Sequence, residues 1–105
     1  MRYDAFRQRL LDAVLNTPGA TPGTLRRAVL ERARGAGEGV PPALTGYVDT
    51  IARHAYKVTD ADVAALQHAG HSDDSLFEIT VAAAVGAALH RLDRGMAALR
   101  GEEPD

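Results

Sequence analysis

The stretch from Ile79 to Leu89, ITVAAAVGAAL, is apolar on almost every face of a helix. A helix that is apolar on all sides has to be covered on all sides. Its alanines and Gly86 would also let neighbouring helices approach closely. The other segments of this 105-residue chain are short. We therefore expect them to cover this helix incompletely, and we expect a subunit interface to cover the rest.

Helical spacing of apolar residues recurs along the whole chain. It predicts helices over residues 2–16, 21–34, 40–57, 59–69 and 72–100. No segment shows the apolar–polar alternation of a strand, and no repeat of solenoid length is present. The expected fold class is all-α, with about five helices in a compact bundle.

Four short signals predict where helices begin and end. Thr21, which precedes a proline, is expected to cap the second helix. Thr59 and Asp62 have the spacing of a capping box. Gly70 is expected to end that helix in the left-handed conformation, and Ser72 to cap the last helix.

The length of the chain predicts a single helical domain over residues 1–100. Within it, residues 1–39 form an N-terminal helical pair and residues 40–100 form the helical core. Residues 101–105 are expected to be a disordered tail.

Composition excludes several classes of function. A net charge of −2 and a pI of about 6.0 argue against a nucleic-acid or membrane-surface binder. The absence of cysteine removes disulfides, thiolate metal ligands and thiol chemistry. The N-terminus lacks the apolar core of a signal peptide, and no apolar run approaches the ~18 residues of a membrane span. We therefore expect a soluble cytoplasmic protein.

Residues 58–92, VTDADVAALQHAGHSDDSLFEITVAAAVGAALHRL, carry a family-like pattern. It runs Thr59-Asp60-x-Asp62-Val63-x-x-Leu66, then Gly70-x-Ser72-Asp73, then Leu76-Phe77-Glu78-Ile79 and an alanine-rich helix. This pattern resembles the helical region of the alkyl hydroperoxidase D and carboxymuconolactone decarboxylase superfamily, over about a third of the chain. The resemblance implies an all-helical homo-oligomer, commonly a trimer or hexamer.

The chemistry of that superfamily transfers only in part. Its peroxidase-type members carry a Cys-x-x-Cys pair, with a nearby histidine and glutamate, on the preceding helix. Here the corresponding residues, 44–56, contain no cysteine, so a dithiol peroxidase cycle is excluded for this chain. His54 lies five residues before Thr59 instead of about ten, so it is not equated with the family histidine. We predict a cysteine-free member without cofactors, acting as a structural or small-ligand-binding homo-oligomer.

An acid–base enzyme is the alternative, because decarboxylase-type members work without the cysteine pair. Tyr47, Thr50 and His54 lie on one strip of a helix, where an imidazole near a phenol can transfer protons. Tyr47 and His54 are the candidate catalytic residues. Arg53 or Arg91 would bind a small carboxylate ligand. An ordinary core-edge tyrosine and a solvated histidine are the favoured explanation of the strip, because the sequence ties no carboxylate or cation to it.

Two further possibilities have weaker signals. His68 and His71 are the one close histidine pair, but a helix break separates them and no motif completes a ligand set, so we expect no metal. Four arginines of the second helix are expected to form a solvated face: Arg26, Arg27, Arg32 and Arg34.

Residues 59–84 could also form a helix-turn-helix regulatory module. Its recognition helix would present Asp73 and Asp74 to the groove first, and these charges repel phosphate. We therefore do not expect nucleic acid as a partner.

Overall fold

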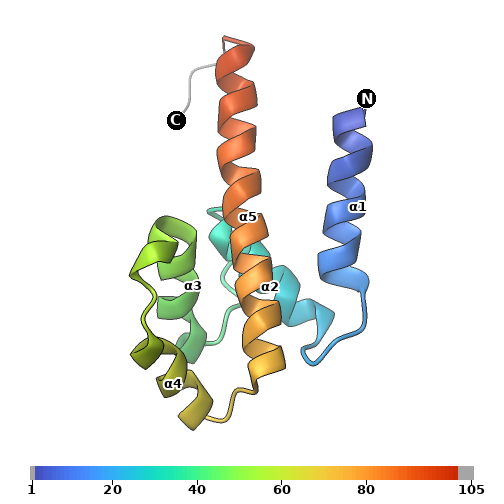
Figure 1. The fold of residues 1–105 in the computed structure, drawn as a ribbon. Helices are drawn as coiled ribbons and strands as arrows, with labels where there is room; N and C mark the ends of the chain where they lie inside the picture. The colour runs from blue at the N-terminus through green and yellow to red at the C-terminus, as the bar shows by residue number, and fades with distance from the viewer. Residues whose placement is uncertain (1, 102–105) are drawn as a thin grey trace.

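The computed structural model describes residues 2–101. In that range the chain forms five α-helices and one short 3-10 turn, without a strand (Figure 1). The elements are α1 (Arg2–Asn16), α2 (Gly23–Ala33), α3 (Pro42–His54), η1 (Ala55–Lys57), α4 (Asp60–His68) and α5 (Asp73–Leu99). The predicted all-α class is confirmed. Most of the predicted tail, residues 102–105, lies outside the described residues.

Local side-chain bonds set the ends of α4 and α5 as predicted. Thr59 Oγ1 accepts a hydrogen bond from the Asp62 N–H (3.1 Å), and the Asp62 carboxylate accepts one from the Thr59 N–H (2.9 Å). Ser72 Oγ accepts a hydrogen bond from the Ser75 N–H (3.1 Å). Between the two helices Gly70 has a φ of +103°, a conformation that glycine adopts without strain.

Two predicted boundaries differ from the structure. Pro22, and not Thr21, is the N-cap of α2, and no side chain caps that helix. The Thr21 hydroxyl instead bonds to the Glu78 carboxylate, because a charged acceptor makes the stronger bond. The α-helical part of α3 ends at His54, and a 3-10 turn carries the chain to Lys57.

One apolar core joins α2, α3, α4 and the first half of α5, with Leu15 contributed by α1. Each fully buried aliphatic side chain stabilises the fold by roughly 1.5–3 kcal/mol. The two predicted parts, residues 1–39 and 40–100, contribute to this same cluster. The largest fully buried side chains are Val29, Leu30, Leu44, Val48 and Ile79.

Helices α2 and α5 approach each other closely at Gly86. A Cβ atom at Gly86 would overlap the Leu30 carbonyl oxygen and would lie 3.0 Å from the Ala33 Cβ atom. The missing side chain therefore allows the backbones to come together. On the other side of α2, Arg32 donates hydrogen bonds of 2.7 and 2.8 Å to the Asp49 carboxylate, which ties α2 to α3.

Helix α5 continues past Ala83, its last residue in this core cluster, with α1 beside it. We call this part of α5, residues 84–99, the overhang. The molecule measures 47 × 28 × 22 Å, and its long axis follows the overhang. Figure 1 shows the start of α1 and the end of α5 at the same end of the molecule, so the two helices are antiparallel. The spacing of Leu89, Leu92, Met96 and Leu99 predicts one packed seam, but only Leu89 is buried.

Helix α5 also has the length and composition of a membrane span. Within residues 2–101 it is the one helix that meets this criterion, with a mean hydropathy of 1.3 over an 18-residue window. The sequence predicts no such segment, because no uninterrupted apolar run approaches ~18 residues. Of that window, 39% is buried against the rest of the protein, and the core helix of a soluble protein meets the same criterion.

Candidate functional site

The apolar stretch 79–89 of α5 is covered on one side only. Ala84 and Ala88 are exposed, and Val81 and Val85 are half-buried. The opposite side of the stretch is buried, where α5 packs against α2 and α3. The expectation of incomplete coverage by this chain is therefore confirmed for the described residues.

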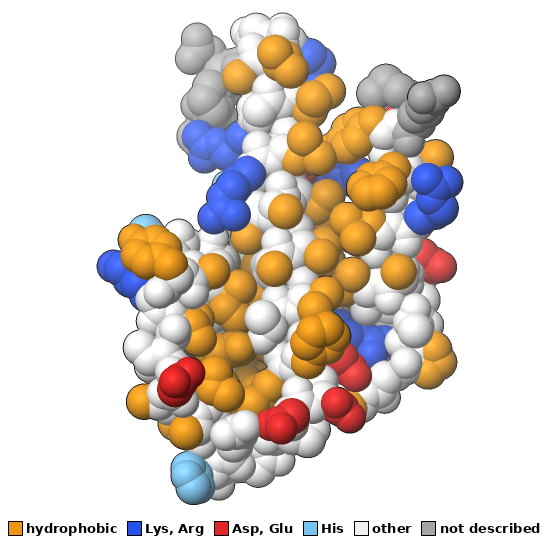
Figure 2. Space-filling model, in the orientation of Figure 1, with side chains coloured by type: hydrophobic (Ala, Val, Ile, Leu, Met, Phe, Trp, Pro, Cys, Tyr) orange, Lys and Arg blue, Asp and Glu red, His pale blue; other side chains and the backbone are white. Residues whose placement is uncertain are grey.

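Large apolar side chains extend this open surface in both directions along α5 and onto α1. The exposed fractions are 70% for Phe77, 42% for Leu92 and 82% for Leu99 on α5, and 59% for Phe6 on α1. Figure 2 shows hydrophobic side chains along the visible side of α5 and across to α1. We call this surface the α1–α5 face. Contiguous apolar patches of this kind mark interaction sites on soluble proteins.

Two hollows lie between α1 and α5 within this face. The first has a volume of about 340 Å³ and is lined almost entirely by apolar side chains of α1 and the overhang. The second, about 290 Å³, lies at the other end of α1, where the loop to α2 begins. The first hollow includes Phe6, Leu10, Ala84, Ala88 and Leu92, and the second includes Ala13, Val14, Phe77, Glu78 and Val81.

An ion cluster joins α1 to the overhang of α5. The Asp93 carboxylate accepts hydrogen bonds from Arg7 of α1 (2.8 and 3.3 Å) and from Arg34, which follows α2 (2.7 Å). Burial raises the pKa of Asp93, but the hydrogen bonds from Arg34 and Arg7 outweigh it and hold the pKa below its ordinary value. Asp93 therefore stays charged and holds α1 against α5.

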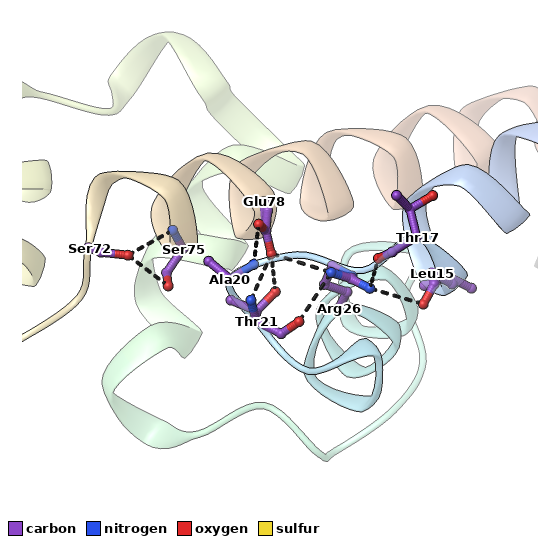
Figure 3. A network of polar contacts seen from close by, with 8 residues as sticks. All are labelled: Leu15, Thr17, Ala20, Thr21, Arg26, Ser72, Ser75 and Glu78. Atoms are coloured by element: carbon purple, nitrogen blue, oxygen red, sulfur yellow. Dashed lines mark hydrogen bonds and ion pairs between the residues drawn. The ribbon is translucent and has the colours of Figure 1, made fainter.

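The Glu78 carboxylate lies at the centre of a polar network (Figure 3). Glu78 also lines the second hollow. It accepts hydrogen bonds from the Ala20 N–H (2.7 Å), the Thr21 N–H (2.8 Å) and the Thr21 hydroxyl (2.6 Å). Arg26 adds an ion pair at 3.3 Å. The Thr21 hydroxyl, the two N–H groups and Arg26 lower the pKa of Glu78 from 4.5 to about 2.

Arg26 is the buried cation of this network, with 5% of its surface exposed. Its Nη2 donates to the carbonyl oxygens of Leu15 (3.2 Å) and Thr17 (2.6 Å), and its Nη1 donates to that of Thr21 (3.1 Å). These bonds hold the loop between α1 and α2 (Figure 3). Every strong donor and acceptor here is used internally except Arg26 Nε, which is buried without a partner. The network is thus a structural latch.

The prediction of a solvated arginine face on the second helix is therefore wrong for Arg26, which is buried. Arg32 and Arg34 stay partly exposed and pair with Asp49 and Asp93. One signal was present in the sequence: Arg26 precedes the apolar Val29 and Leu30 by three and four residues. That spacing places it on the buried side of the helix.

The three side chains of the predicted strip, Tyr47, Thr50 and His54, do not lie in one site. Tyr47 and Thr50 line a hollow of about 360 Å³ between α3 and α4, whose lining does not include His54. The Tyr47 hydroxyl is hydrogen-bonded to Thr80 Oγ1 (2.6 Å). The His54 ring is exposed at the end of α3 and lies edge-on to Tyr56, with the ring centres 5.7 Å apart.

The two predicted ligand-binding arginines lie near the end of α3. Arg91 of α5 donates a 2.9 Å hydrogen bond to the Ala52 carbonyl oxygen, which satisfies an acceptor in the last turn of that helix. Arg53 follows directly and is exposed. Arg53 precedes His54 in the chain, and neither arginine lines the hollow that holds Tyr47, so the structure does not assemble the predicted acid–base set.

The remaining predicted features stay separate. Within residues 2–101, no group of three or more histidine and carboxylate side chains is placed to hold a metal ion. Of the predicted histidine pair, His68 is exposed and His71 is half-buried. Asp73 and Asp74 are exposed at the start of α5, where a recognition helix would need to approach phosphate.

Comparison with models of known protein families, with curated proteins and with solved structures finds no match.

Proposed function

We propose that this chain acts as a structural homo-oligomer that assembles through the α1–α5 face. The observation that carries the proposal is the exposure of Phe77, Ala84, Ala88 and Leu92 along one side of a helix whose other side is the core. Burial of apolar surface contributes about 25 cal/mol per Å², so covering this face would stabilise a protein with a small core of its own.

The proposal also retains the family-like interpretation of residues 58–92. Its pair of capped helices, the second of which is alanine-rich, supports a cysteine-free relative of the alkyl hydroperoxidase D superfamily. Such a relative lacks dithiol peroxidase activity because this chain has no cysteine. The trimer or hexamer that the resemblance implies, like a cytoplasmic location, remains part of this proposal.

Small-ligand binding would use the same face. The two hollows of about 340 and 290 Å³ have apolar linings, so they would hold a small apolar molecule where subunits meet. In this arrangement a ligand site and an assembly contact would be one surface. Glu78 and Arg26 at its edge are already satisfied by the loop between α1 and α2, apart from the one buried Nε–H.

The acid–base alternative has less support. It requires Tyr47 and His54 in one site with a free arginine, but His54 is outside the lining of the hollow and Arg91 bonds to a carbonyl oxygen. Replacing His54 with alanine tests it: unchanged turnover of a small carboxylate or lactone by His54→Ala would exclude this residue.

A regulatory module that binds DNA is opposed by Asp73 and Asp74, and a salt-dependent shift of a DNA duplex would revive it.

Light scattering over a concentration series tests the proposal. The wild type is expected to form an oligomer of defined mass, and Ala84→Glu is expected to shift it to the monomer. Ala61→Glu on α4 is the matched control, because Ala61 is exposed away from the face. A wild-type monomer at every concentration, or an equal effect of both substitutions, would contradict the proposal.

A further inference from the structure

The open side of α5 has a spacing that is symmetric about Ala88. Its outward positions are separated by 4, 3 and 4 residues before Ala88 and by 4, 3 and 4 residues after it. At 3.6 residues per turn these positions form one stripe along the helix. All of them are exposed except Val81, which is half-buried. The stripe consists of Phe77, Val81, Ala84, Ala88, Leu92, Gly95 and Leu99.

From the sizes of the side chains along this stripe we propose that α5 pairs antiparallel with α5 of a second copy, about a two-fold axis through Ala88. This inference rests on the proposed self-association and specifies its partner and register. In an antiparallel pair centred on Ala88, each position faces the one equally far on the other side of the centre. Phe77 then faces Leu99 of the partner subunit, and Val81 faces Gly95 of the partner subunit.

The side chains are complementary in size in this register. Ala84 faces Leu92 of the partner subunit, and the glycine opposite Val81 has open space around it. The two central alanines allow the helix axes to approach to the short end of the usual 8–10 Å range. A parallel pair would instead place Phe77 against itself and leave a gap at Gly95.

The charges on α5 also favour the antiparallel direction. Asp73 and Asp74 are exposed at its start, and Arg91 and Arg94 are exposed in its second half. An antiparallel pair opposes the two helix dipoles and places Asp73 and Asp74 of the two subunits at opposite ends of the contact. A parallel pair would align the dipoles and bring these four carboxylates together at one end.

The available surface is close to what a stable pair needs. The stripe from 77 to 99 is ~33 Å long, and a helix is ~10 Å wide. Helix α1, with Phe6 and Leu10 beside the stripe, adds a second strip ~22 Å long, giving roughly 550 Å² in projection. Specific interfaces bury roughly 600–1,000 Å² on each partner, so this face lies near the lower end of that range.

Single-cysteine variants test this register directly, because the wild-type chain contains no cysteine. Ala88→Cys is expected to form a disulfide-linked dimer under mild oxidation. Neither Ala84→Cys alone nor Leu92→Cys alone is expected to form this dimer. In each case the two introduced cysteines, one in each copy, would be ~12 Å apart along the helix axis, beyond disulfide reach. An equimolar mixture of those two variants is expected to cross-link.

The exposed Ala61→Cys is the control for random collision, and we expect Ala88→Cys to link at least ~10-fold faster. Self-linking of Ala84→Cys and Leu92→Cys would overturn the antiparallel direction. If light scattering shows an oligomer but Ala88→Cys does not cross-link, this register is overturned and self-association stands. A measured mass of three chains would have the same consequence. A monomer that does not link would overturn both proposals, and a monomer that sediments with phospholipid vesicles would assign the face to a membrane.

Discussion

The Thr21 hydroxyl donates a 2.6 Å hydrogen bond to the Glu78 carboxylate and so joins the loop before α2 to α5. The two residues are 57 positions apart in the chain. With the N–H groups of Ala20 and Thr21 and the Arg26 guanidinium, this bond fixes where α1 leaves the core. The orientation of α1, and with it one wall of the α1–α5 face, therefore depends on the Glu78 carboxylate at one end of α1 and on the Asp93 carboxylate toward the other.

Replacing Glu78 with glutamine should destabilise the protein. The amide keeps the size of the side chain but removes the charge and leaves an N–H facing donors, which costs about 1–3 kcal/mol when the group is shielded from water. Urea unfolding measures the change, and Glu38→Gln in the exposed loop before α3 is the matched control. Equal stability of the two variants would show that the latch contributes nothing.

Acid should weaken the same latch. The pKa of Glu78 is lowered from 4.5 to about 2 in the folded protein, so the unfolded chain binds its proton first as the pH falls. The stabilisation is complete above pH 4.5 and is lost progressively as the pH falls toward 2. Asp49 and Asp93, whose pKa values are also lowered, contribute with the same sign. Unfolding free energy measured across this range should fall less steeply for Glu78→Gln than for the wild type.

Gly86→Ala should destabilise the core although alanine favours helix formation. The added methyl group meets the Leu30 carbonyl oxygen and would force α2 and α5 apart, a strain that typically costs 1–3 kcal/mol. Gly46→Ala on α3 is the control, because a Cβ there meets nothing within 4 Å and should stabilise the helix by up to about 1 kcal/mol. Thermal unfolding that moves in the same direction for both would contradict this account.

Asp93→Asn should loosen α1 selectively. Its carboxylate is the shared acceptor for Arg7 and Arg34, and it is partly exposed, so the loss should be under about 1 kcal/mol. Hydrogen exchange of the α1 amides should rise by up to about fivefold, while α3 is unaffected. Asp49→Asn, which breaks the pair with Arg32 instead, should leave α1 exchange unchanged; faster α1 exchange in that variant would mean that the two contacts are not independent.

Features decided within a few residues could be predicted from the sequence. The capping box of Thr59 and Asp62, the left-handed Gly70 and the Ser72 cap all involve neighbours along the chain. The incomplete coverage of residues 79–89 was also predictable, because too few other segments exist to surround an all-apolar helix.

The latch could not be predicted in the same way. Arg26 and Glu78 are 52 positions apart, and the burial of Arg26 depends on carbonyl groups of a loop whose course only the folded chain defines. Thr21 had a plausible local role as a helix cap, and a distant carboxylate displaced it. The spacing of Arg26 before Val29 and Leu30 placed it on the buried side, but gave no indication of its partners.

The overhang of α5 separates two properties that small proteins usually encode together. The positions that face α2 and α3 form the core, whereas the exposed outward positions contribute little to it. On the proposed assembly, substitutions along the outward edge would change how strongly this helix associates while the core stays intact. Exchange of a few small residues there would be enough to convert a lineage from an assembled to a solitary form.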